Sequence, residues 1–192
     1  MPSQLWLIRH GETEWTLSGA HTGSTDIPLT DAGRRQALKL KQSLAGRRFA
    51  LVLASPLSRA QETCNLAGFG GGAQIESNLV EWRYGEYEGR TMAQIQADAP
   101  GWSIWRSGVP GGEQIAEVAA RANCVIRRAL REGGDVALFG HGHILRILTA
   151  CWLELPPDSG RLFALDTAAI GVLGYERDDR VISRWNAGAS SE

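Results

Sequence analysis

Short apolar segments alternate along the chain with longer segments whose apolar residues recur at helical spacing, and this alternation most constrains the fold. Residues 5–9 (LWLIR), 50–54 (ALVLA) and 135–140 (DVALFG) have the length and composition of buried strands. Residues 170–176 and 180–185 predict an antiparallel C-terminal hairpin. Strands that alternate with amphipathic helices favour the α/β class, an α/β sandwich with a mainly parallel sheet.

Helical stripes lie between the predicted strands. Thr30 is a suitable N-cap for the first helix, and Ser55 is predicted to cap the second, with Pro56 at its first helical position. Four segments predict helices: the stretch between Thr30 and Gly46, residues 55–68, the stretch from Ile115 to Ala129, and the stretch from Ile144 to Leu153.

Length and composition indicate one soluble globular domain spanning residues 1–192. The net charge is -1 and no run of five like charges occurs, which disfavours nucleic-acid and membrane partners. Cys64, Cys124 and Cys151 each fall in an apolar stripe and predict buried, reduced thiols. No signal peptide and no apolar run of about 20 residues is visible, so a cytoplasmic location is expected.

Basic side chains follow the predicted parallel strands at the point where each strand ends. Arg9 and His10 follow the first strand, residues 55–59 follow the second, and His141 follows the third. The carboxyl ends of parallel strands meet at one edge of a sheet, where ligands of such folds bind. Residues 80–112, rich in Trp, Gly and Pro, are expected to cross that edge as a lid.

Taken singly, these residues have ordinary explanations: a strand-end histidine is more often structural, and an exposed arginine needs no special role. Together, Arg9, Arg59, His10 and His141 would form a cationic pocket in a protein of almost no net charge. The planar arginine fork matches phosphate oxygens, and the cations would keep an imidazole neutral and nucleophilic. Glycines at positions 11, 140 and 142 would let backbone N–H groups approach an anion. The residues therefore predict a phosphate pocket with a histidine nucleophile.

A metal site is the competing interpretation. His141 and His143 form an H-x-H pair to which His10 and His21 could add ligands. A divalent cation would then lie among arginines, and the strand ends supply no aspartate. We therefore expect no metal.

Five motifs in a fixed order carry a resemblance to a known family. LIRHGETEW, TGSTDIPLTDAG, ASPLSRAQET, EWRYGEYEG and FGHGHILR, over roughly residues 5–150, resemble the histidine phosphatase superfamily, also called phosphoglycerate-mutase-like. The resemblance implies a three-layer α/β/α sandwich and a phosphohistidine intermediate. EWRYGEYEG and GHGHILR look more like the broad-specificity acid phosphatases and the sedoheptulose-bisphosphatase-like members than like the glycolytic mutases.

The resemblance also implies roles for individual residues. His10 would take the phosphoryl group, Glu81 would protonate the leaving oxygen, and the phosphate oxygens would be held by Arg9, Arg59 and His141. The residues predicted to bind substrate are Gly11, Thr16, Thr22, Gly23, Tyr84, Gly142 and His143.

The predicted function is a cofactor-free, metal-independent phosphatase that acts on small phosphorylated metabolites, sugar phosphates in particular. One alternative is a cofactor-dependent phosphoglycerate mutase. It is disfavoured because residues 90–113 contain no lysine to grip a substrate carboxylate and because Thr16 stands where the mutases usually have asparagine. The other alternative is a non-catalytic phospho-ligand-binding module, disfavoured because all five catalytic positions hold competent residue types. A homodimer is left open, since the helix faces identify no dimer patch.

Overall fold

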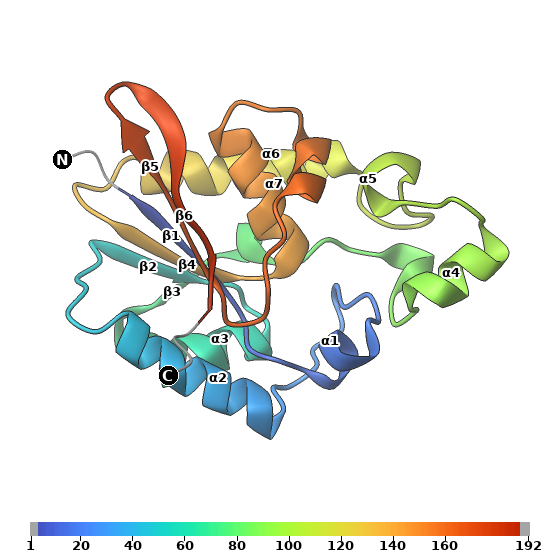
Figure 1. The fold of residues 1–192 in the computed structure, drawn as a ribbon, viewed down its shortest axis with the longest axis horizontal. Coiled ribbons are helices and arrows are strands. Elements are labelled where there is room, and N and C mark those ends of the chain that lie inside the picture. Colours follow the sequence, from blue (N-terminus) through green and yellow to red (C-terminus); the bar gives the residue numbers. More distant parts are fainter. Residues whose placement is uncertain (1–3, 189–192) are drawn as a thin grey trace.

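A computed structural model describes residues 4–188 as a six-stranded mixed sheet with helices on both faces (Figure 1). The strand order is β3-β2-β4-β1-β5-β6. The β1, β2, β3 and β4 strands are parallel, while β5 pairs antiparallel with both β1 and β6. The strands are β1 (Leu5–Arg9), β2 (Leu51–Ala54), β3 (Gln74–Ile75), β4 (Val136–Gly140), β5 (Ile170–Glu176) and β6 (Asp179–Ala187).

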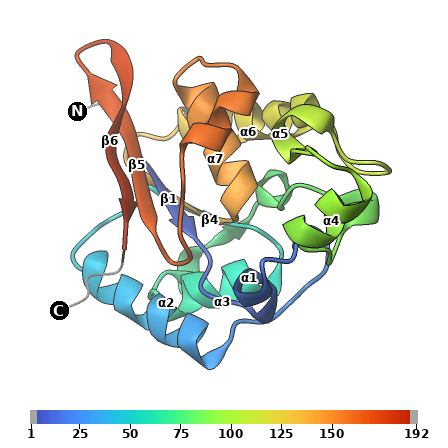
Figure 2. The same ribbon diagram turned by 45° about the vertical axis from the view of Figure 1, so that its right-hand side comes forward.

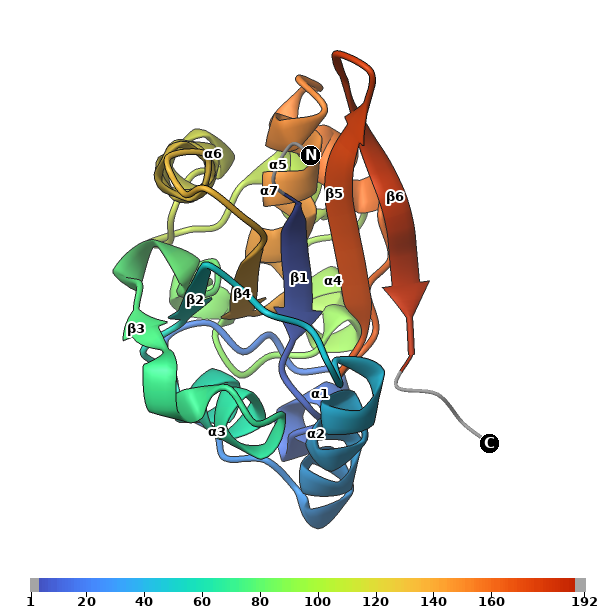
Figure 3. The same ribbon diagram turned by 90° about the vertical axis from the view of Figure 1, so that its left-hand side faces the viewer.

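Two helical layers cover the sheet, α2 (Asp31–Ser43) and α3 (Ser58–Leu66) on one face and α6 (Ile115–Ala129) and α7 (Gly142–Trp152) on the other (Figure 3). Successive side chains of β1 point to opposite faces. Leu7 packs in the cluster with α6 and α7, whereas Ile8 packs in the cluster with α2 and α3, and both are fully buried. The predicted three-layer α/β/α sandwich with its antiparallel hairpin is confirmed.

Of the smaller elements, α1 (Glu14–Ser18) and α4 (Met92–Asp98) lie toward the end of the sheet where β1 stops (Figure 2). Within the segment predicted as a lid, Trp82, Tyr84 and Ile95 are buried in the same core cluster as α6 and α7. The smaller elements are α1 (Glu14–Ser18), η1 (Gly70–Gly72), η2 (Ser77–Leu79), η3 (Gly85–Tyr87), α4 (Met92–Asp98), α5 (Ile104–Ser107) and η4 (Pro157–Leu162).

The start of α3 differs from the prediction. Ser55 donates its backbone N–H to the Phe139 carbonyl of β4 over 2.9 Å, so the chain is still extended there and the helix begins only at Ser58. The predicted cap at Ser55 is therefore wrong. Asp26 caps the N-terminus of α3 instead. Its Oδ1 accepts hydrogen bonds from the Ser58 backbone N–H over 2.9 Å and from the Ser58 hydroxyl over 2.8 Å.

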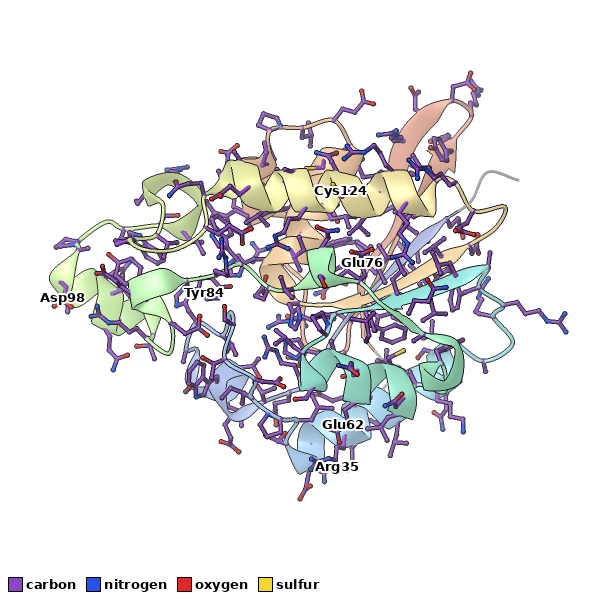
Figure 4. All side chains as sticks on the ribbon, turned by 180° about the vertical axis from the view of Figure 1, so that it is seen from behind. Arg35, Glu62, Glu76, Tyr84, Asp98 and Cys124 are labelled. Atoms are coloured by element: carbon purple, nitrogen blue, oxygen red, sulfur yellow. The ribbon has the colours of Figure 1, made fainter. Side chains whose placement is uncertain are left out.

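The cysteine prediction is wrong at one position. Cys64 is buried, and burial raises its pKa to about 12, whereas Cys151 is partly buried and Cys124 is exposed on α6 (Figure 4). Position 124 lies about 200° around the helix from Ala122, which is on the buried face. All three thiols are free. Across residues 4–188, no helix is both long enough and apolar enough to span a membrane.

Candidate active site

The carboxyl ends of β1 and β4 bring two histidines together. Arg9 is in register with Gly140, so the next residues, His10 and His141, are neighbours. Their ring centroids are 5.1 Å apart. The backbone of His10 is held on both sides, because its N–H donates to the Gly140 carbonyl and its carbonyl accepts from the Ala168 N–H, each over 3.0 Å. The predicted meeting of these strand ends is confirmed.

The hydrogen bonds of His10 define its free nitrogen. Nδ1 lies 2.7 Å from the Gly11 carbonyl oxygen, which can only accept, so Nδ1 carries the proton and Nε2 keeps its lone pair. Burial lowers the pKa of His10 well below its ordinary range, and the charges of Arg9 and Arg59 lower it further. The imidazole is therefore neutral. We predicted that the cations keep the imidazole neutral, but burial is the larger cause.

Arg9 carries an unpaired donor beside His10. Its Nη1 donates to the Leu165 carbonyl over 2.5 Å, while its buried Nε–H has no hydrogen-bond partner within residues 4–188. Gly142 lies against this guanidinium, since a Cβ at position 142 would be in van der Waals contact with Arg9 Cζ at 3.4 Å. Because an unsatisfied buried N–H costs about 1–3 kcal/mol, an oxyanion that accepts from it would be stabilised.

Arg59 and His141 lie behind His10 rather than on the cavity wall. Arg59 is fully buried, donating from Nε to His141 Nδ1 over 3.1 Å and from its two Nη atoms to backbone carbonyls of residues 22–25 over 2.9–3.3 Å. His141 Nε2 lies 2.8 Å from the Ser55 hydroxyl, so both of its ring nitrogens have protein partners. The side chain of His141 is fully buried.

A cavity of about 230 Å³ opens beside His10, smaller than the roughly 300–1,000 Å³ of sites for drug-sized ligands. It is therefore suited to a small metabolite. Eight of the predicted site residues line it: Arg9, His10, Thr16, Thr22, Glu81, Tyr84, Gly142 and His143.

Two predicted glycines serve packing instead of lining the cavity. The Gly11 N–H donates to Thr63 Oγ1 over 3.1 Å, and a Cβ at position 11 would lie 2.4 Å from the Gly33 carbonyl oxygen. The Gly23 N–H donates to Glu88 Oε1 over 2.9 Å. In this structure the N–H groups of both glycines are thus engaged within the protein.

Glu81 sits on the cavity wall and also caps α7. Its Oε1 accepts from the backbone N–H groups of Trp82 and Ile144, and its Oε2 accepts from that of His143, all over 2.9 Å. The side chain is buried. Three fixed donors therefore hold one carboxyl group in a defined orientation beside the cavity.

Sequence reasoning missed five residues of the wall: Trp15, Gly19, Ala20, His21 and Arg146. The first four come from the short α1 and its following loop, which show no apolar periodicity. The sequence indicated His21 only as a possible metal ligand, and its Nδ1 lies 2.9 Å from the Arg90 carbonyl oxygen. The sequence could have predicted Arg146 on the cavity wall, because Arg146 follows Gly142 by four residues and therefore lies on the same face of the helix. Within residues 4–188, no group of three or more His, Cys, Asp or Glu is placed to hold a metal ion.

A neutral imidazole with a free Nε2, an unpaired guanidinium N–H and an oriented carboxyl group share this cavity. A free imidazole nitrogen can act as a nucleophile, an unpaired N–H can bind an anion and a carboxyl group can carry a proton. Together these groups fit a group-transfer enzyme for oxyanionic substrates.

Comparisons with known proteins identify the family. The profile of the histidine phosphatase superfamily (branch 1) matches residues 5–188. An acid phosphatase of Mycobacterium tuberculosis is 40% identical over 184 residues, which cover 94% of this chain and 90% of the relative. The sedoheptulose 1,7-bisphosphatase of Saccharomyces cerevisiae is 32% identical, with coverages of 78% and 67%. A solved mycobacterial glucosyl-3-phosphoglycerate phosphatase in complex with VO3 superposes with a TM-score of 0.88 at 29% identity, covering 97% of this chain and 100% of the other. The chain belongs to the histidine phosphatase superfamily, and the resemblance inferred from its motifs is confirmed.

Proposed function

We propose that this protein is a metal-independent phosphatase that hydrolyses phosphomonoesters of small metabolites, sugar phosphates in particular, through a phosphohistidine on His10. The observation that carries the proposal is the neutral imidazole of His10, with Nε2 free, beside the unpaired Nε–H of Arg9. The named relatives support it, because each is called a phosphatase or bisphosphatase and two of the names specify a sugar-derived substrate.

In the first half-reaction, His10 Nε2 attacks the phosphorus atom and the P–O bond to the sugar breaks. The leaving oxygen takes a proton from the Glu81 carboxyl group, so that an alcohol departs. The Arg9 Nε–H donates to a non-bridging oxygen, and charge neutralisation by arginine stabilises the transition state. We assign the other oxygens to Arg59 and His141, which would exchange one of their present protein hydrogen bonds for a bond to phosphate.

In the second half-reaction, water attacks the phosphohistidine and gives a proton to the Glu81 carboxylate. The P–N bond breaks, inorganic phosphate leaves, and both His10 and Glu81 regain their starting protonation states. Thr16, Thr22, Tyr84 and His143, which line the cavity, would contact the rest of the substrate.

The proposal also covers the domain organisation, the location and the partners of the protein. Residues 1–192 form one domain, with residues 80–112 covering one side of the site. The protein acts in the cytoplasm on small molecules, without a nucleic-acid or membrane partner; its small net charge supports this assignment.

The test measures release of inorganic phosphate from p-nitrophenyl phosphate and from a panel of sugar phosphates, in EDTA, with and without vanadate. We expect turnover that persists in EDTA, is inhibited by vanadate and is absent from His10→Ala. In parallel, 3-phosphoglycerate is supplied with catalytic 2,3-bisphosphoglycerate. Isomerisation at tens per second, a rate typical of metabolic enzymes, would overturn the phosphatase proposal in favour of a mutase.

A further inference from the structure

The loop of residues 22–25 holds the Arg59 guanidinium through its backbone carbonyls. Arg59 donates from Nη1 to the Thr25 carbonyl over 2.9 Å and from Nη2 to the Thr22 and Gly23 carbonyls over 3.3 and 3.1 Å. Within residues 4–188, no backbone–backbone hydrogen bond involves residues 22–25. Side-chain contacts therefore have to keep these carbonyls directed at the guanidinium.

Glu88 holds the opposite side of the same loop. Its Oε1 accepts from the backbone N–H of Gly23 over 2.9 Å and from that of Thr25 over 3.1 Å. The Thr22 carbonyl and the Gly23 N–H belong to one trans peptide unit, in which the two groups point in opposite directions. This peptide unit thus lies between a guanidinium that donates to its oxygen and a carboxylate that accepts from its N–H.

The contact with Glu88 explains the glycine at position 23. A Cβ there would lie 2.6 Å from Glu88 Oε2 and 2.5 Å from the Trp82 carbonyl oxygen. The charge of Glu88 also reaches Arg59: burial lowers the pKa of Arg59, and the charge of Glu88 is among those that oppose this change. The loop, the glycine and the carboxylate therefore form one support for the buried cation.

We propose that Glu88 is a positioning residue, which holds the loop of residues 22–25 and through it the guanidinium of Arg59. This inference rests on the proposed function, in which Arg59 binds a phosphate oxygen, and it adds a residue that does not line the cavity. When Arg59 exchanges one loop carbonyl for phosphate, Glu88 keeps the other carbonyls in place, so the guanidinium stays preorganised for the ligand.

The test compares Glu88→Ala, Arg59→Lys and the double variant by kcat/KM for p-nitrophenyl phosphate and by the rise in Tm that inorganic phosphate causes. A hydrogen bond to a charged group favours one conformation by about tenfold or more, and we expect Glu88→Ala to lower kcat/KM and phosphate affinity at least about tenfold. In the Arg59→Lys background the same change should cost no more than about twofold, because the group that Glu88 positions is already gone. A carboxylate that only stabilises the fold would give the same loss in both backgrounds.

Glu88→Gln tests whether the hydrogen bonds carry the effect. Only Oε1 of Glu88 accepts hydrogen bonds within residues 4–188, so the glutamine oxygen can take both N–H groups while its amide nitrogen takes the place of Oε2. We expect this variant to regain most of the activity that Glu88→Ala loses. A glutamine variant as weak as the alanine variant would contradict the proposed role of these bonds.

Glu117→Ala is the matched control. Glu117 also accepts a backbone N–H, that of Gln114 over 2.7 Å, and lies outside the cavity. It should keep kcat/KM and phosphate affinity within about twofold of the wild type. If Glu88→Ala does not fold, Glu88→Asp decides, because its shorter side chain weakens the same bonds with a smaller change in packing. We then expect a loss of at least about threefold that again disappears in the Arg59→Lys background.

Equal losses in the two backgrounds, or full activity and phosphate affinity in Glu88→Ala, would overturn the inference. Absence of p-nitrophenyl phosphate turnover in the wild type would overturn the proposed function alone, because the Tm series with inorganic phosphate still measures binding. The two failures are therefore distinguishable.

Discussion

Replacing Glu81 by glutamine separates the two tasks that the structure gives this side chain. The glutamine Oε1 can still accept from the backbone N–H groups of Trp82 and Ile144. Its amide nitrogen, however, would face the His143 N–H that Glu81 Oε2 now accepts over 2.9 Å. The variant therefore loses the transferable proton of the carboxyl group and leaves one N–H at the start of α7 opposite another donor.

Each loss has its own expected magnitude. An N–H without an acceptor costs about 1–3 kcal/mol of unfolding free energy, and in a domain of this size each kcal/mol lowers Tm by roughly 2–4 °C. Loss of general acid catalysis should lower kcat for a sugar phosphate by about 10²–10⁴-fold. The loss should be much smaller for p-nitrophenyl phosphate, because its leaving group departs without a proton.

The assay measures kcat on both substrates together with Tm. Glu76→Gln is the control: Glu76 is another buried carboxylate, paired with Arg128 over 2.6 Å and outside the cavity. It should lose stability without changing the ratio of the two kcat values. If Glu81→Gln lowered both kcat values equally, or if the control changed the ratio as well, Glu81 would not be the proton donor, and Glu86 or Glu88 would be tested next.

Four further predictions concern His10 and its surroundings. Labelled substrate should leave acid-labile, base-stable phosphate on the wild type after an acid-free quench, and label on His10→Ala would rule out His10 as the nucleophile. Arg59→Lys keeps the charge but cannot reproduce the bonds to His141 and to the carbonyls of residues 22–25, so kcat/KM should fall at least tenfold, about 1.4 kcal/mol; a silent variant would show that charge alone suffices. Because the pKa of His10 is lowered, protonation should reduce kcat/KM only well below pH 6.5, and an acid limb at or above 6.5 would contradict this. The pKa values of His141 and His143 are lowered too, so the unfolded chain binds more protons below pH 6.5, and the unfolding free energy measured in urea should fall there by up to about 4 kcal/mol per pH unit for the three groups together.

The fold was predictable where a local pattern and a topological rule act together. Residues 5–8 are apolar because both faces of a central strand are covered, and that burial produces a continuous apolar run that is visible in the sequence. Parallel pairing then aligns the carboxyl ends of β1 and β4, which is why His10 and His141 could be expected to meet before their distance was known.

The remaining site residues depend on contacts that no local pattern contains. Trp15 and His21 reach the cavity because the loop after α1 pairs with the segment at Thr91, through a single bridge from Ala20. Ser55 is an acceptable N-cap by composition, but its pairing with β4 takes precedence and directs its hydroxyl to His141. In both cases a long-range hydrogen bond decides the position of a side chain that local propensity would place elsewhere.

The glycine of the Arg-His-Gly triplet shows how several demands meet in one motif. We predicted that Gly11 would let a backbone N–H approach phosphate, but the structure packs the first turn of α2 against this segment. A Cβ at position 11 would lie 2.4 Å from the Gly33 carbonyl oxygen, and a Cβ at position 33 would lie 2.1 Å from the Glu12 carbonyl oxygen. This contact brings the loop after β1 back across the sheet, and the Gly11 carbonyl is thereby presented to His10 Nδ1. The glycine therefore bears on the proposed chemistry indirectly: it allows the close packing that orients its carbonyl, and the carbonyl selects the tautomer that leaves Nε2 free, as the proposed nucleophilic attack requires.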